Sequence, residues 1–133
     1  MSQAELFETL GAPLKNVRWS WGGVRKSDGA VFLRVWQDGT KKINGKRYIW
    51  ISVESPLGND LGENERMDHL KLVQAGHPCY LVMCQAVDTS ATPRAIQSFN
   101  RNEVFETGDT ILDDGDYWVE IRGRVNVREI ARA

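Results

Sequence analysis

Short stretches in which apolar and polar residues alternate fill the first half of the chain after residue 16, and they predict β-strands. Side chains of a strand point alternately to its two faces, so this period of two marks a sheet with one buried face. Turn signals of the Asx-Gly type separate the stretches, because these pairs accept the positive φ angles of a tight hairpin. The signals are Asp28-Gly29, Asp38-Gly39 and Asn44-Gly45. The pattern predicts an antiparallel meander with strands at 17–26, 30–37 and 47–54.

Two segments carry apolar residues at helical spacing instead. The first opens with Ser2 and Glu5, which form a capping-box pattern, and ends before Gly11. The second covers 63–75, where acidic residues open the segment, Gly76 closes it, and an apolar stripe is predicted to pack on the sheet. The stripe consists of Met67, Leu70 and Val73.

The remainder of the chain returns to strands. Residues 79–87 form a nearly continuous apolar run, which is typical of a central strand covered on both faces. A turn-rich stretch at 88–101 follows, in which we expect one helical turn around 95–99. The last predicted strands are 104–106, 110–112, 117–122 and 125–130.

The length and composition indicate one globular domain spanning residues 1–133. Its 133 residues are 41% hydrophobic and 26% charged, and no apolar run is long enough to cross a membrane. The N-terminus lacks the basic start and apolar stretch of a secretory signal, so we expect a cytoplasmic protein with no membrane partner. The predicted fold class is α+β, with a strongly curved antiparallel sheet or a β-barrel and two main helices.

Charge is distributed unevenly along the chain despite a formal net charge of −1. Through Trp50 there are nine lysines and arginines against four acidic residues, whereas eight basic and fourteen acidic residues follow. An anionic ligand is therefore expected to meet the first half of the chain. The alternative is that lysines at hairpin edges block the pairing of one sheet with another.

Tryptophan and arginine side chains in the first half are the main functional candidates. Trp19 and Trp21 flank Ser20, so in a strand their rings share one face, which is either a core wall or a stacking platform. A domain of this size cannot bury every large ring, so one or two of them are expected to line a groove. Rings that stack on bases and cations that neutralise phosphates act together in nucleic-acid binding. The predicted ligand-binding residues are Trp19, Trp21, Trp36, Trp50, Arg18, Arg25, Arg34 and Arg47.

Catalytic and metal-binding patterns are weak by comparison. Glu65 and His69 lie four residues apart on the second predicted helix, but a metal site needs a third ligand, and surface charge explains the pair. Cys79 and Cys84 are expected to lie on opposite faces of one strand as buried, unreactive thiols, without a disulfide. Ser20 is not in a GxSxG elbow. We therefore expect no catalytic residues, no metal and no cofactor.

Several sequence strings resemble a known module. Residues 11–22 (GAPLKNVRWSWG), 65–70 (ERMDHL), 76–80 (GHPCY) and 93–96 (PRAI) resemble an uncharacterised bacterial module found beside HNH nucleases. This resemblance implies a nuclease or other protein as a partner, and it carries no catalytic residues because the nuclease motif is absent. The order of elements is also similar to PUA-like barrels, including EVE domains, which implies binding of RNA or modified DNA bases in an aromatic pocket.

The leading hypothesis is a nucleic-acid-binding module that recognises a modified or flipped base of DNA or RNA. One alternative is a protein-interaction or regulatory subunit that uses Trp19 and Trp21 as a hot spot for a partner or for a second copy in a homodimer. A further alternative is a small-molecule enzyme that uses Glu65, His69 and Asp116.

Overall fold

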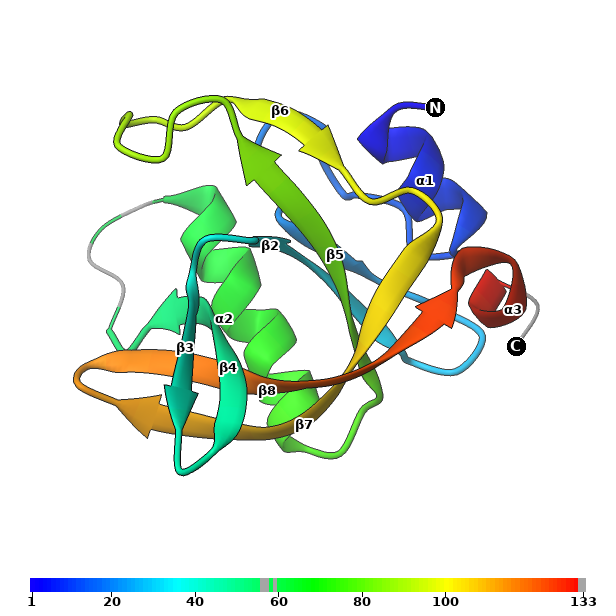
Figure 1. Ribbon diagram of the computed structural model, residues 1–133. Helices are drawn as coiled ribbons and strands as arrows, with labels where there is room; N and C mark the ends of the chain where they lie inside the picture. Colours follow the sequence, from blue (N-terminus) through cyan, green and yellow to red (C-terminus); the bar gives the residue numbers. More distant parts are fainter. Residues whose placement is uncertain (56–57, 59, 132–133) are drawn as a thin grey trace.

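The computed structural model describes residues 1–55, 58 and 60–131. This part of the chain forms a single α+β domain with eight strands and three helices (Figure 1). The elements in chain order are α1 (Gln3–Thr9), β1 (Gly22–Val24), β2 (Val31–Trp36), β3 (Thr40–Ile43), β4 (Lys46–Val53), α2 (Leu61–Gln74), β5 (Cys79–Ala86), β6 (Ile96–Phe99), β7 (Glu103–Asp113), β8 (Asp116–Asn126) and α3 (Val127–Ala131).

The strands form one curved sheet in the order β1-β2-β5-β7-β8-β4-β3, and β6 pairs with β5 at the side (Figure 1). The sheet is not closed into a barrel. All of its pairs are antiparallel except β2 with β5, where Val31 lies opposite Cys79 and Trp36 opposite Cys84. A parallel pair needs a long crossover, and here the β3–β4 hairpin and α2 provide it. The predicted curved sheet is thus mixed rather than purely antiparallel.

The two faces of β2 and β5 bury separate core clusters. Phe32 and Val82 pack with α1 and α3 on one face, where Leu6 is also fully buried. Leu33 and Leu81 face the other way and pack with Leu70 of α2. The period-two alternation of these strands therefore places α2 on the opposite side of the sheet from the two terminal helices.

Helix α2 covers the gap between the two ends of the curved sheet, in contact with β1, β2 and β4. The predicted stripe faces the sheet as expected, since Leu70 is buried and Met67 and Val73 pack against the same core. Asp60 caps the N-terminus by accepting a hydrogen bond from the Glu63 N–H. In the described part of the chain, no helix is long and apolar enough to cross a membrane.

The prediction of a strand at 17–26 is wrong for its first half. Only Gly22–Val24 is a strand, and Trp19-Ser20-Trp21 lies in the connection before it. Hydrogen bonds close a local turn there, because the Ser20 N–H donates to the Asn16 carbonyl at 2.9 Å and the Ser20 hydroxyl accepts from the Asn16 N–H at 2.9 Å. Trp19 and Trp21 are therefore not alternate residues of one strand, and the sequence argument that their rings share a face does not hold.

Other differences arise where pairing is not local. The expected helical turn at 95–99 is strand β6, which pairs with β5. The segment 40–43, for which the sequence predicts no strand, is strand β3, and the predicted strands 104–106 and 110–112 are parts of one longer strand, β7. The last predicted strand, 125–130, ends at Asn126, and residues 127–131 form α3 because Val127 and Ile130 complete the core around α1.

Candidate functional site

A cleft of about 240 Å³ lies where the end of β2, strand β4 and the first half of α2 meet. A residue from the connection before β1 and two from the connection between β5 and β6 complete it. The residues that line this cleft, called the tryptophan cleft below, are Trp21, Arg34, Val35, Trp36, Trp50, Arg66, Pro93 and Arg94.

The three tryptophans come from three separate segments, and backbone hydrogen bonds hold them together. The Trp21 carbonyl accepts from the Arg34 N–H at 2.7 Å, which attaches it to β2. Gly39 links the other two, because its N–H donates to the Trp36 carbonyl at 3.0 Å and its carbonyl accepts from the Trp50 N–H at 2.9 Å. All three side chains are partly buried, so part of each ring is available to a ligand.

The guanidinium of Arg66 lies between the two ends of the sheet and is 2% exposed. It donates to the carbonyl of Ile51 in β4 at 2.8 Å, and to those of Trp21 and Arg34 at 3.1 and 2.6 Å. Its Cζ lies 5.4 Å from the centroid of the Trp21 ring, within the range of a cation–π contact. Arg66 therefore joins β4 to the β1–β2 edge, and one tryptophan of the cleft rests against it.

The positive charge at this place is not neutralised by an acid. Among the described residues neither Arg66 nor Arg34 forms an ion pair, and Nε of Arg66 is buried without a hydrogen-bond partner. Burial, and then the charge of Arg34, lower the pKa of Arg66 to about 10. Burial also lowers the pKa of Arg34, whose Nη1 donates to Oε1 of Gln3 at 3.3 Å. A buried cation without an acid partner is costly, and an anion bound beside it would offset that cost.

Glu65 lies close enough to influence Arg66, but it does not neutralise it fully. Burial raises the pKa of the Glu65 carboxyl, and its Oε2 accepts a hydrogen bond from the Ser20 hydroxyl at 3.1 Å. Its Oε1 is buried without a partner in the described structure. Glu65 thus anchors the turn before β1 to α2 and does not line the tryptophan cleft.

Arg94 covers the outer side of the cleft. Its two terminal nitrogens bind the Asp38 carboxylate at 2.7 and 2.9 Å, and Nη2 also donates to the Thr89 carbonyl at 2.6 Å. Its Cζ lies 5.4 Å from the centroid of the Trp36 ring. A second hollow of about 270 Å³ adjoins here, and it shares Trp36, Trp50 and Arg94 with the cleft.

Four of the eight predicted ligand-binding residues meet in the tryptophan cleft: Trp21, Trp36, Trp50 and Arg34. Three others, Trp19, Arg18 and Arg47, do not line the cleft. Trp19 and Arg18 belong to the turn before β1, and Arg47 is exposed on β4 and lines a different cavity. The last one, Arg25, is buried.

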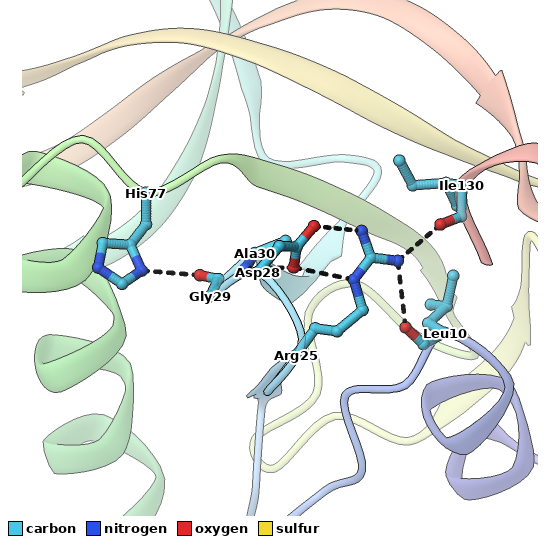
Figure 2. Close-up of polar contacts among 7 residues, drawn as sticks. All are labelled: Leu10, Arg25, Asp28, Gly29, Ala30, His77 and Ile130. Atoms are coloured by element: carbon cyan, nitrogen blue, oxygen red, sulfur yellow. Dashed lines mark hydrogen bonds and ion pairs between the residues drawn. The ribbon is translucent and has the colours of Figure 1, made fainter. Parts of the chain in front are cut away.

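Arg25 is a structural residue that ties three parts of the chain together (Figure 2). It is 4% exposed and binds the Asp28 carboxylate through Nε at 3.0 Å and Nη2 at 2.8 Å. Nη1 donates to the carbonyls of Leu10 and Ile130 at 3.4 and 2.6 Å. Because its donors are used inside the protein, we exclude Arg25 from the candidate site.

Sequence reasoning missed Arg66 and Arg94. Arg66 did leave a signal, since it shares a helical face with Leu70 and Val73 at positions i, i+4 and i+7, and an arginine on a core-facing stripe needs buried acceptors or a ligand. Arg94 left none, because its pairing with Asp38 spans 56 residues.

The residues proposed for the enzyme alternative do not gather. His69 is 7% exposed on α2, Glu65 binds Ser20, and Asp116 begins β8 opposite Asp113. Within the described residues no group of three or more His, Cys, Asp or Glu side chains is arranged to hold a metal ion.

Cys79 and Cys84 match their prediction. Both are free and buried, in the clusters on opposite faces of β5. Burial raises the pKa of each thiol to about 11, which makes both poor nucleophiles.

Comparison of the chain with protein-family models, with curated proteins and with solved structures finds no match. The resemblances to a nuclease-associated module and to PUA-like domains stay predictions, and function must be inferred from the geometry of the cleft.

Proposed function

We propose that the protein binds nucleic acid by taking one unstacked base into the tryptophan cleft, with a phosphate of the same strand beside Arg34 and Arg66. The observation that carries this proposal is buried Arg66 with partly buried Arg34, neither of which has an acid partner among the described residues, next to three tryptophan rings. Rings favour a flat π system, and the cations favour an anion, so a nucleotide satisfies both.

The size of the cleft supports a single base rather than a duplex. Its volume of about 240 Å³ is slightly below the usual range for drug-sized ligands, about 300 to 1,000 Å³. A base enters such a space only when it is already single-stranded or has been turned out of a duplex. Among the described residues no carboxylate lines the cleft itself, so nothing there repels a phosphate.

The alternative of a protein partner has less support. It depends on Trp19 and Trp21 forming one hot spot, but Trp21 lines the cleft whereas Trp19 does not. No other observation favours it.

Fluorescence anisotropy with labelled single-stranded DNA and RNA tests the proposal. We expect binding that weakens as salt is raised, because phosphate contacts release counterions. Trp50→Ala removes one ring of the cleft and is expected to weaken binding by roughly 5- to 150-fold, which corresponds to about 1 to 3 kcal/mol for a stacked base. Arg94→Ala tests the outer side of the same cleft.

Two variants outside the cleft are matched controls. Trp19→Ala removes a ring and Arg18→Ala removes an exposed cation, and neither residue lines the cleft. Each is expected to bind like the unaltered protein within about a factor of two. If these variants lose as much affinity as Trp50→Ala, or if neither DNA nor RNA binds, the proposal is wrong.

A further inference from the structure

A second cavity, of about 510 Å³, opens beyond the β2–β3 turn. Its floor is apolar, with Met83, Phe105 and Ile121 from three central strands. Its rim is polar and comes from the β2–β3 turn, β4, β5, and β6 with the residue after it. The rim residues that matter below are Gln37, Arg47, Gln85, Ser98 and Asn100, and we call this space the amide cavity.

The polar rim leaves hydrogen-bond donors for a ligand. Gln85 Nε2 donates to Oε1 of Gln37 at 2.8 Å, and Oε1 of Gln85 accepts from the Ser98 hydroxyl at 2.8 Å, so the amide nitrogen of Gln37 is outside this chain of bonds. Asn100 uses Oδ1 to accept from the N–H groups of Asn102 and Glu103, both at 3.0 Å, and its amide nitrogen also remains. Amide donors above an apolar floor suit the edge and face of a nucleobase.

Positive charge borders the amide cavity as well. Arg47 is exposed and lines it, and Lys42 lies directly opposite Arg47 in the β3–β4 register. Residues that face each other across an antiparallel pair place their side chains on the same side of the sheet. In the described part of the chain, no Asp or Glu lines the amide cavity.

The tryptophan cleft and the amide cavity are connected around the β2–β3 turn. The hollow beside the cleft extends to Asp38 and Gly39. A further hollow of about 460 Å³ starts at Asp38 and shares Gln37 and Gln85 with the amide cavity. Neighbouring hollows that share lining residues thus run from one space to the other, past the Asp38 carboxylate, which is paired with Arg94. This arrangement fits a chain of linked units better than one compact molecule.

We infer that the ligand is a single strand of at least two nucleotides, with one base in the tryptophan cleft and a neighbouring nucleotide of the same strand in the amide cavity. This inference rests on the proposed function and adds a second subsite to it. Arg47, predicted from the sequence as a phosphate contact, serves the second subsite rather than the first.

Isothermal titration with 5′-phosphorylated oligothymidylates of one, two, four and eight nucleotides, and with the matching oligouridylates, tests this inference on the full chain. A strand that occupies both subsites at once binds more tightly than one that occupies a single subsite. Affinity is therefore expected to rise by about 10-fold or more between the mononucleotide and the shortest oligonucleotide that reaches both the tryptophan cleft and the amide cavity. Gln37→Ala and Arg47→Ala should abolish most of that rise while leaving mononucleotide affinity unchanged, because neither residue lines the tryptophan cleft. Both side chains are exposed, so we expect these variants to fold normally, as thermal unfolding would verify.

Matched controls are Gln74→Ala, which removes an exposed glutamine of α2, and Arg18→Ala. The second subsite is refuted if affinity does not grow with length, or if Gln37→Ala and Arg47→Ala leave the longer oligonucleotides bound as tightly as before. In that case mononucleotide binding that still depends on Trp50 would leave the proposed function intact. Failure of every length to bind would refute both.

Discussion

Gly62 decides where the Trp21 ring can lie. A Cβ at this position would stand 2.6 Å from Nε1 of Trp21 and 2.9 Å from the Trp19 carbonyl oxygen. In a helix, alanine is ordinarily more stable than glycine by about 1 kcal/mol. Here we expect Gly62→Ala to lower the free energy of unfolding by about 1 to 3 kcal/mol, because the indole must shift. Urea unfolding measures this loss, and a weaker oligonucleotide affinity is expected with it.

Gly123 in β8 is the matched control for this substitution. A Cβ there meets no heavy atom within 4 Å, so Gly123→Ala is expected to change stability by less than about 0.5 kcal/mol and to leave binding unchanged. A Gly62→Ala protein that is more stable than the unaltered one would mean that helix propensity outweighs the contact with Trp21.

His69 makes stability depend on pH. Burial, together with the charge of Arg66, lowers its pKa from the ordinary 6.5 to about 4, and Nδ1 is buried without a partner in the described structure. The unfolded chain therefore takes up a proton at a higher pH than the folded one. As pH falls from 6.5 to 4, this residue should lower the free energy of unfolding by up to about 1.4 kcal/mol per pH unit.

Urea unfolding of His69→Gln between pH 7 and 4 isolates this effect. The variant lacks the titrating ring, so the stability of the unaltered protein relative to the variant should fall over that interval. A constant difference would show that the pKa of His69 is the same in the folded and the unfolded chain, which contradicts the prediction.

The terminal helices depend on one side chain from the β1–β2 hairpin. Arg25 binds the carbonyl of Leu10 after α1, that of Ile130 in α3, and Asp28 in the hairpin turn. Arg25→Ala is expected to lower the free energy of unfolding by about 3 kcal/mol, because buried acceptors lose a charged donor. Hydrogen exchange should become faster in both terminal helices. Arg18→Ala, which removes an exposed cation, should have little effect.

Elements whose signals lie in consecutive residues could be predicted from the sequence. The capping box of Ser2 and Glu5 is present, and α2 and the central strand β5 lie where their patterns indicate. Strand β6 could not be predicted, because its conformation depends on pairing with β5 rather than on its own residues. The segment before β1 misled for a different reason: its alternating tryptophans are typical of a strand, but Ser20 closes a local turn with Asn16.

The candidate site could be predicted only in part. Its aromatic members follow from residue type, because a small domain leaves some large rings at the surface. Which arginines join them depends on tertiary contacts: Arg25 is used by the core, whereas Arg66 comes from a helix that the sequence associates with packing. Residue type therefore indicated a site of aromatic rings and cations, whereas tertiary contacts determined which tryptophans and arginines form it.

The curved sheet stays open between β2 and β4, and Arg66 is the side chain that spans this gap. Arg66→Met keeps a similar length but removes the donor to the Ile51 and Arg34 carbonyls, each at a cost of about 1 to 3 kcal/mol. The Trp21 carbonyl loses its bond to Arg66 but keeps the Arg34 N–H. Removing a buried cation next to Arg34 offsets part of that cost. We therefore expect a net loss of about 2 to 4 kcal/mol in the free energy of unfolding, with faster hydrogen exchange at the facing edges of β2 and β4.

The same variant separates the two roles that Arg66 can have. If closure of the sheet is its main role, Arg66→Met loses stability with or without oligonucleotide. If the Arg66→Met protein is instead as stable as the unaltered one, the cost of burying the charge cancels the stabilisation from its hydrogen bonds. Under the proposed function that cost is recovered on binding, because a ligand at 100 times its Kd stabilises the folded state by about 2.7 kcal/mol. Thermal unfolding with and without a saturating oligonucleotide decides between these cases. If a phosphate of the oligonucleotide binds beside Arg66, the ligand should raise the unfolding temperature of the unaltered protein more than that of the variant.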